Sequence, residues 1–472
     1  MMTNPPDLHD AFHIRFGVWL YNTAFFKLLG VSEFSFFLPT LLMSASFAVI
    51  GYFLLLHWRY GELNSFLAGM FIASAPFEVL IGVVRANDLI FSWFLALGFL
   101  SFVMLDKKSI LQGVLVATFL WLAFYVKLWV IYLLPPLCLY YLYGFVKNRE
   151  WKGPLSFALV TLLLHGAMGL YFQRSIGLFF PFFAEHSATY PVESSSLVWL
   201  FSLYPQAVFV GSQFGTTLFG CIPYLLVFLL SVKLLLMFVK PKSKFAGFDK
   251  WDLYLIAFYM SFFLLLEFFP NTFVFDQYYS APRIFRYLAP ISFPMTLHLA
   301  KLVLDTGKTR LFPASMKKYG PAILLVLLIF VNIVQAGDAT GPGRSYRSAL
   351  FSVLGDIKKL SPSTVICESW LKYFMDEIYL KGTGITVLSV PDYTYDTAPK
   401  YESWLGNVTP SLTGKTVLVT GLGNYVHYGC LNCGFRLDLF ANPLDSGWKL
   451  YSTYNLSYLS PPEPARVWVR TF

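Results

Sequence analysis

FFLPTLLMSASFAVIGYFLLL, residues 36–56, contains no charged side chain. About 20 apolar residues cross a bilayer as a helix, and a helix satisfies its own backbone hydrogen bonds in lipid. This run therefore predicts a transmembrane helix. Similar runs follow it, so we expect ten spans, near residues 36–56, 64–84, 88–105, 109–126, 128–146, 153–173, 214–239, 252–270, 287–304 and 320–336.

The composition agrees with a multi-pass membrane protein. Hydrophobic residues make up 57% of the chain and charged residues only 13%, whereas soluble domains average about 25% charged residues. The net charge of +9 could indicate nucleic-acid binding in a soluble protein. Here the cations lie in loops between spans, where membrane orientation and anionic lipid account for them. We therefore expect the membrane, and no nucleic acid, as a partner.

Positive charge is concentrated in every second loop. One set of loops holds fourteen cations: Arg59, Lys107, Lys108, Lys147, Arg149, Lys152, Lys240, Lys242, Lys244, Lys250, Lys308, Arg310, Lys317 and Lys318. The alternating set holds five: Arg85, Lys127, Arg174, Arg283 and Arg286. Because cytoplasmic loops carry the Lys/Arg excess, the first set is predicted to face the cytoplasm of a cell (inner or plasma) membrane. The second set and the C-terminal region are predicted to face outward.

Three regions are expected along the chain. Residues 1–35 would form an outer-surface segment with an amphipathic helix over 11–30, and residues 36–336 the membrane domain. With ten spans and this polarity the N-terminus lies outside, yet no earlier span or signal peptide is visible. Either the N-terminus is translocated without help or a first span is missing, and we favour the second interpretation.

Residues 337–472 change in character. Helices are expected over 344–360 and 369–381, and runs rich in Val, Thr and aromatic residues predict strands. These strands are expected at 363–369, 385–390, 415–421, 448–454 and 465–472. Helices between strands predict an extracytoplasmic α/β domain. Cys430 and Cys433 form one CxxC pair, compatible with a local disulfide but not with a four-cysteine zinc site.

Cations on the outer side of a membrane protein are disfavoured, so their convergence suggests an anion. Arg283 and Arg286 are three residues apart and share a helix face, while Lys127 interrupts the apolar stretch FYVKLWV. Arg85 and Arg15 also belong to the outer side. A lipid-linked phosphate suits this set, and ordinary snorkelling or ion pairing is the alternative.

Carboxylates also gather toward the outer side, and no cluster among them argues for a metal. They are Asp7, Asp10, Glu78, Asp88, Glu267 and Asp276. Glu78 and Glu267 lie within spans, where ionisable groups are costly, and are site candidates for that reason. Lys233 lies about 10 Å from the inner edge of its span at 1.5 Å rise per residue, so we expect it to snorkel to that edge.

Four stretches together resemble a known family: HIRFGVWLYNTAFFKLLGVSEFS (13–35), VVRANDLIFSWFLALG (83–98), FYVKLWVIYLLPPL (124–137) and RIFRYLAPISFPMTLHLA (283–300). In order and topology they resemble the polytopic membrane glycosyltransferases of the type C fold. The likeness is to glycosyltransferase family 39 and its relatives, the branch with protein O-mannosyltransferases and bacterial lipid A aminoarabinose transferase. The resemblance implies an all-α membrane bundle that transfers a sugar, with inversion, from a polyprenyl-phosphate donor to a lipid, glycan or protein acceptor outside.

The resemblance also implies roles for residues. Lys127, Arg283 and Arg286 would hold the lipid phosphate, and the groups supporting them would be Arg15, Arg85, Tyr278, Tyr279 and Tyr287. Fixed cations stabilise a leaving phosphate without a cofactor, and a divalent metal is compatible with the chemistry.

The catalytic carboxylate is the point of departure from the family. A sugar-transfer enzyme needs a base for the acceptor hydroxyl, and the family usually supplies it from an Asp-Glu pair after the first span. The N-terminal segment here contains no such pair. Asp10 is the nearest substitute, although a disordered N-terminal tail is the favoured explanation for it, and Asp88 would orient either substrate or Arg85.

Two rival functions remain open on the sequence. A transporter or flippase of lipid-linked sugars should carry charges near the bilayer midplane, often in two related halves, whereas the charges here lie outward and no repeat is visible. An inactive assembly subunit is consistent with a missing first span. Turnover of a labelled polyprenyl-phosphate sugar would separate these hypotheses.

Overall fold

The computed structural model describes residues 16–84, 87–106, 109–181, 221–240, 245, 247–268, 288–308, 319–390, 398–422, 447–456 and 463–472. By its internal contacts the chain divides into two compact units. The first comprises residues 37–337 with the N-terminal segment up to Leu28, and the second comprises residues 338–472 with residues 29–36. Cys430 and Cys433 lie outside the described residues.

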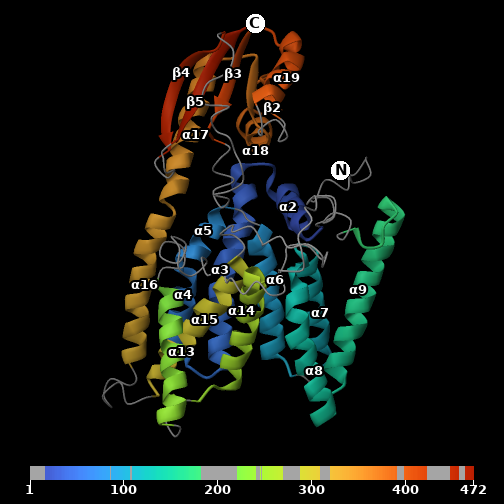
Figure 1. The fold of residues 1–472 in the computed structure, drawn as a ribbon, viewed down its shortest axis with the longest axis vertical. Helices are drawn as coiled ribbons and strands as arrows, with labels where there is room; N and C mark the ends of the chain where they lie inside the picture. Colours follow the sequence, from blue (N-terminus) through green and yellow to red (C-terminus); the bar gives the residue numbers. More distant parts are fainter. Residues whose placement is uncertain are drawn as a thin grey trace. The chain divides into compact units, whose positions relative to one another are not determined.

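The first unit is a helical bundle (Figure 1). Its helices are α2 (Phe16–Leu29), α3 (Glu33–His57), α4 (Glu62–Ala73), α5 (Pro76–Val84), α6 (Asn87–Met104), α7 (Ile110–Phe124), the 3₁₀ helix η1 (Leu128–Leu133), α8 (Leu134–Asn148), α9 (Lys152–Ile176), α13 (Ile222–Val239), α14 (Lys250–Phe268), α15 (Ala289–Thr306) and α16 (Gly320–Ala339). Each of the ten expected spans contains a helix, and the expectation of a polytopic helical bundle is confirmed.

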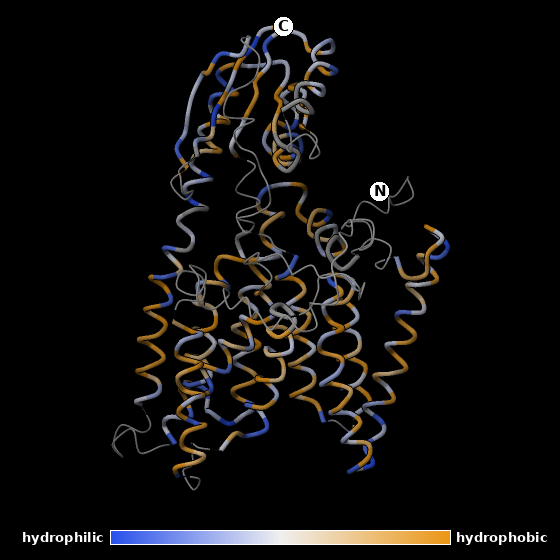
Figure 2. The backbone as a smooth tube through the Cα atoms, viewed as in Figure 1, coloured by the Kyte–Doolittle hydropathy of each residue, from blue (hydrophilic) through white to orange (hydrophobic). Residues whose placement is uncertain are grey.

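Length and apolar composition identify the membrane-crossing helices. Six described helices qualify, or seven if the bent pair α4 and α5 is one span. Figure 2 shows apolar residues along these helices and polar residues toward their ends. Helix α7 is shorter, and α14 and α15 carry the charged residues of an internal network. The protein is a multi-pass membrane protein.

The span expected at 64–84 is broken in the middle. Helices α4 and α5 meet at a bend of 58°. Pro76 opens α5 and has no N–H, so the ladder of α4 cannot continue through it. The N–H missing at Pro76 would have served the Ile72 carbonyl, which accepts from Ala75 N–H at 3.1 Å. The Phe71 carbonyl therefore lacks Ala75 as its helical donor and accepts from Ser74 Oγ at 3.0 Å and from Asn332 Nδ2 of α16 at 3.3 Å. The side chain of another helix thus satisfies backbone that the break leaves open in an apolar interior.

Helix α15 is the central element of the bundle. It packs against α4, α5, α6, α13 and α14, and 17 of its 18 residues are buried. Pro290 lies in its first turn, where a missing N–H costs nothing. A helix enclosed on all sides must satisfy its polar side chains within the protein. Each polar side chain of α15 is therefore expected to have a partner inside the protein.

The second unit contains an α/β fold, as predicted. Its elements are α17 (Gly341–Leu360), β1 (Thr364–Glu368), α18 (Ser369–Phe374), the π-helix η4 (Met375–Tyr379), β2 (Thr386–Val390), α19 (Ala398–Val408), the 3₁₀ helix η6 (Thr409–Ser411), β3 (Lys415–Thr420), β4 (Lys449–Leu456) and β5 (Glu463–Thr471). All five expected strands are present, and both expected helical regions are helical. Helix α19 was not predicted.

The five strands form one mixed sheet in the order β2-β1-β3-β5-β4. Strands β1, β2 and β3 are parallel, and β5 pairs antiparallel with both β3 and β4. Val417 and Val419 of β3 pack in one core with α17 and α18. Leu418 between them packs on the opposite face with Leu405 of α19. The period of two residues in β3 thus produces a three-layer α/β/α unit.

Candidate functional site

An ion pair joins two turns that the charge pattern assigns to the outer side. Lys127 Nζ lies 2.5 Å from Asp88 Oδ1, and both side chains are largely buried. Asp88 is the second residue of α6. The Lys127 backbone is extended, between the end of α7 and the start of η1. Two predicted site residues, 39 positions apart, therefore meet at one end of the bundle.

The ring of Trp129 covers the same lysine. Lys127 Nζ lies 3.3 Å from the ring centroid of Trp129, close enough for a cation–π interaction. Asp88 accepts a hydrogen bond from this ammonium. The carboxylate and the aromatic face together fix the position of the lysine charge.

The remaining predicted site residues lie outside the described part of the chain. They are Asp10, Arg15, Arg85, Tyr278, Tyr279, Arg283, Arg286 and Tyr287. Their roles stay predictions. In sequence, Arg283, Arg286 and Tyr287 come within five residues before Leu288, the first described residue ahead of α15.

Glu78 is a buried carboxylate on α5, only 2% exposed. The hydroxyl of Ser292, in the first part of α15, lies beside it. Neither Glu78 Oε1 nor Ser292 Oγ has a hydrogen-bond partner of good geometry among the described residues. The sequence singled out Glu78 as an ionisable group within a span. Glu267 has no described side chain.

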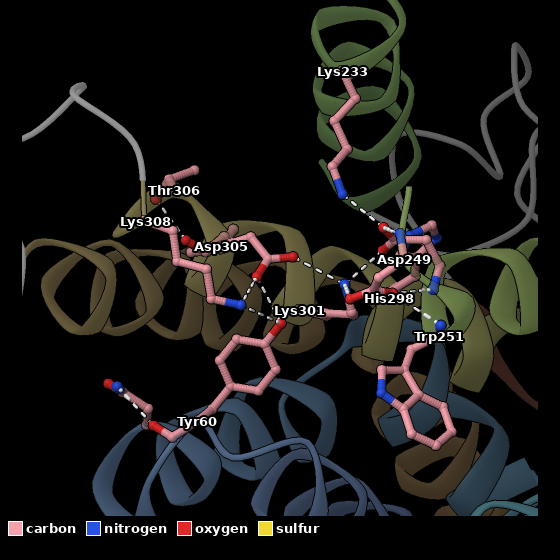
Figure 3. Close-up of polar contacts among 12 residues, drawn as sticks. Tyr60, Lys233, Asp249, Trp251, His298, Lys301, Asp305, Thr306 and Lys308 are labelled. Carbon is pink, nitrogen blue, oxygen red and sulfur yellow. Dashed lines mark hydrogen bonds and ion pairs between the residues drawn. The ribbon is translucent and has the colours of Figure 1, made fainter. Parts of the chain in front are cut away.

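A second group of charges lies at the other end of α15 (Figure 3). Lys301 is fully buried, and its Nζ lies 2.7 Å from Asp252 Oδ1, 2.9 Å from Asp305 Oδ2 and 2.9 Å from Asp249 Oδ2. The three donors of the ammonium thus meet three carboxylates. Lys233 of α13 binds the other oxygen of Asp252 at 2.7 Å. The network therefore joins α13, α14 and α15.

The same network includes a half-exposed lysine and continues into the bundle. Tyr60 donates to Asp305 Oδ1 at 2.7 Å, and the half-exposed Lys308 lies 2.5 Å from the same oxygen. On the other side, His298 contacts Asp252 at 3.2 Å and the Tyr259 hydroxyl at 3.2 Å. Loops that the charge pattern assigns to the cytoplasm therefore converge at one end of the bundle.

Tyr60 lies in the loop before α4 and donates a hydrogen bond within this network. Burial raises the pKa of its phenol well above the ordinary value, and the negative charge of Asp305 raises it further. The phenol therefore keeps its proton over the whole physiological pH range. It can donate to Asp305 wherever that carboxylate is charged.

Asp249, Asp252 and Asp305 bring three carboxylate oxygens within 4.8 Å of one another, which is a geometry that could hold a cation. Lys301 Nζ is bonded to all three. A metal at this position would have to displace a fully buried ammonium, leaving that charge unpaired in the interior. The donor set therefore fits lysine and not a divalent ion.

The snorkelling expected of Lys233 is wrong. Its side chain is only 3% exposed and is bound to Asp252 within the bundle. The sequence carried a signal for this network in the spacing of His298, Lys301 and Asp305, which share a face of one helix. Three ionisable groups on one helix in a membrane protein predict partners on neighbouring helices.

Comparison with known proteins finds similarity in structure but no match in sequence. No protein-family model and no curated protein matches the chain. ArnT from Cupriavidus metallidurans in the apo state aligns with a TM-score of 0.50 and 12% identity, over 98% of this chain and 93% of ArnT. The chain has the ArnT fold. The predicted likeness to the type C glycosyltransferase fold is thereby confirmed.

A second ArnT structure is also similar. ArnT bound to undecaprenyl phosphate aligns with a TM-score of 0.45 and 13% identity, over 96% of this chain and 87% of ArnT. At identities this low, the similarity to ArnT shows only the fold of the chain. The activity of the chain has to be inferred from its individual residues.

Proposed function

We propose that the protein is a membrane glycosyltransferase that transfers a sugar from a polyprenyl-phosphate donor to an acceptor on the extracytoplasmic side. The observation that carries this proposal is the contact of Lys127 with Asp88 at the predicted outer end of the bundle. It occurs within an ArnT fold that extends over 98% of the chain. A cation on the side where cations are disfavoured is a candidate contact for an anionic substrate.

The proposed mechanism relies on fixed charges. Lys127, Arg283 and Arg286 would bind the donor phosphate, Arg as a fork of donors and Lys as a point charge. Their charge would stabilise the phosphate as the bond to the sugar breaks. Asp88 holds Lys127 in place. The residues proposed to complete the site are Asp10, Arg15, Arg85, Tyr278, Tyr279 and Tyr287.

The orientation is part of the proposal. The loop before α16 contains Lys308, Arg310, Lys317 and Lys318 and belongs to the cytoplasmic set. Helix α16 crosses the membrane once more before the α/β domain begins. That domain is therefore proposed to be extracytoplasmic. The donor sugar is proposed to be a hexose or pentose, as in mannosyltransferase-like enzymes, and the acceptor a lipid, a glycan or a protein.

A transporter of lipid-linked sugars is the second candidate, and the break between α4 and α5 favours it. Discontinuous helices often line transport sites. The buried charges of α15, however, are paired with one another near the inner end. These paired charges therefore do not form a substrate site at the bilayer midplane.

The donor site is tested by removing two cations from one helix face. Arg283→Ala with Arg286→Ala should lower affinity for undecaprenyl phosphate at least 100-fold in detergent-purified protein, since two charge-assisted contacts are lost. Native mass spectrometry measures this binding. Lys317→Ala with Lys318→Ala removes equal charge from a cytoplasmic loop and should bind normally. Equal affinity in both double variants would exclude the site.

A further inference from the structure

Glu78 differs from the buried aspartates of the bundle. Asp88, Asp252 and Asp305 each have a lysine ammonium within 2.9 Å. Among the described residues, no ammonium or guanidinium forms an ion pair with Glu78, and its Oε1 lacks a hydrogen-bond partner. Burying a carboxyl without a partner is costly. Such a group inside a membrane protein is a candidate for function.

The fold holds Glu78 firmly in this position. Ser44 Oγ of α3 donates to the Glu78 carbonyl at 2.8 Å. Gly82, one turn further along α5, lets α5 pack closely on α3, because a Cβ there would lie 2.9 Å from Ser44 Cβ. The backbone that carries the carboxylate is thus fixed by two contacts with a neighbouring helix.

Two helix N-termini converge on the carboxylate. Glu78 is in the first turn of α5, which starts inside the bundle because Pro76 interrupts the span. Ser292 belongs to the N-terminal part of α15. The N-terminus of a helix carries a partial positive charge that stabilises an anion. Both helix N-termini therefore favour an anion beside them, and the Glu78 carboxyl forms no ion pair with a described cation.

The chain connects this position to the predicted donor site. Helix α5 leads through residues 85–86 into Asp88, and α15 begins directly after Arg286 and Tyr287 in sequence. Both helices that carry the Glu78–Ser292 contact therefore end at the segments that hold the predicted phosphate ligands. Asp88 forms an ion pair with Lys127, whereas Glu78 forms no ion pair with a described cation.

We propose that Glu78 is the catalytic base of the sugar transfer, an inference that rests on the proposed function. The Glu78 carboxylate accepts the proton of the acceptor hydroxyl. The acceptor oxygen forms a bond to the anomeric carbon of the sugar, and the bond from that carbon to the phosphate oxygen breaks. Its electron pair leaves with the polyprenyl phosphate, and the Ser292 hydroxyl positions the Glu78 carboxyl.

Glu78→Gln tests this assignment because it preserves size and removes basicity. In nanodiscs with radiolabelled undecaprenyl-phosphate mannose and lipid-extract acceptors, this variant should transfer sugar at least about 100-fold more slowly than the unmodified protein. Its affinity for undecaprenyl phosphate and its unfolding temperature should be unchanged. Glu150→Gln, which removes a buried carboxylate near the inner end, should retain full activity.

The other outcomes distinguish failure of the proposed function from failure of the Glu78 assignment. If the unmodified protein transfers no sugar from any hexose or pentose donor, the proposed function fails, and the assignment of Glu78 fails with it. If it transfers sugar and Glu78→Gln does so at a similar rate, only the assignment of Glu78 is overturned. Should Glu78→Gln misfold, Glu78→Asp decides: slower transfer with an unshifted acidic limb of the pH–rate profile contradicts the base, and a shifted limb supports it.

Discussion

Lys301 shows how a full positive charge is accommodated inside a membrane bundle. Its ammonium has three protons, and three carboxylates accept them. Lys233 binds the second oxygen of Asp252. The three lysines of the network, Lys233, Lys301 and Lys308, match its three aspartates in number, so the buried charges are compensated within the protein. Removing one member leaves an uncompensated charge, which is the costly case for a buried pair.

Lys301→Met should therefore destabilise the bundle by about 3–5 kcal/mol. Equilibrium unfolding by steric trapping in bicelles measures this free energy. Lys308→Met, which removes a half-exposed member of the same network, should cost under about 1 kcal/mol. A loss for Lys301→Met no larger than that for Lys308→Met would show that the network is not a stability element.

Lys127 is expected to contribute to donor binding. Lys127→Met should weaken binding of undecaprenyl phosphate about 10- to 100-fold, because a hydrogen bond to a charged group contributes about 1.5–3 kcal/mol. Calorimetric titration of the purified protein measures the affinity. Lys147→Met removes a lysine of the cytoplasmic set and is the matched control. Unchanged affinity in Lys127→Met would leave that residue with a structural role alone.

At the scale of elements, the broken span is the feature with the clearest physical cause. Pro76 cannot donate to the Ile72 carbonyl, so Ala75 N–H bonds to Ile72, and Asn332 of α16 donates to the Phe71 carbonyl that Ala75 leaves. Asn332 is completely buried. A side chain of α16 therefore stabilises the break between α4 and α5.

Asn332→Leu should cost about 1–3 kcal/mol, the range for leaving a buried polar group without its partner. The same unfolding measurement applies, and hydrogen exchange at the α4–α5 bend should increase. Ser231→Ala on the exposed side of α13 should change neither quantity. Wild-type stability in Asn332→Leu would mean that the Phe71 carbonyl is satisfied by Ser74 alone.

The elements also show what sequence patterns could and could not predict. Apolar runs located each described helix that is long and apolar enough to cross a membrane, because burial in lipid requires an apolar helix. Strands such as Thr386–Val390 and Lys415–Thr420 were evident from Val and Thr. Helix α19 was missed, since its short apolar face packs only through tertiary contacts with the sheet. The bend at Pro76 was also missed, although a proline inside a helical pattern is its signal.

The α/β unit has its own polar link between layers. Asp356 of α17 accepts hydrogen bonds from Ser452 and Tyr454 of β4, both at 2.5 Å. Asp356→Ala should leave both hydroxyls without this acceptor and destabilise the unit by about 1–3 kcal/mol. Hydrogen exchange of β4 in the full-length protein would rise. Asp376→Ala, at an exposed carboxylate of the π-helix, is the control, and equal protection in both variants would contradict the link.

At the scale of the whole molecule, the buried ion pairs form two groups: one joins α6 to the residue before η1, and the other joins α13, α14 and α15. Asp88 and Lys127 were predicted individually from topology, but their contact across 39 residues could not be read from a linear pattern. The network around Lys301 was missed because each member looks like an isolated snorkelling or surface charge. Pairing in a membrane interior depends on which helices are neighbours, and tertiary packing decides that.

The central claim is that sugar leaves its lipid carrier at this protein. The most direct measurement uses proteoliposomes containing the purified chain and radiolabelled undecaprenyl-phosphate sugar. Label should move from the donor to an acceptor, with free undecaprenyl phosphate appearing in equal amount. If the donor instead crosses the bilayer intact, with label and lipid still joined, the protein is a transporter and the glycosyltransferase account is wrong.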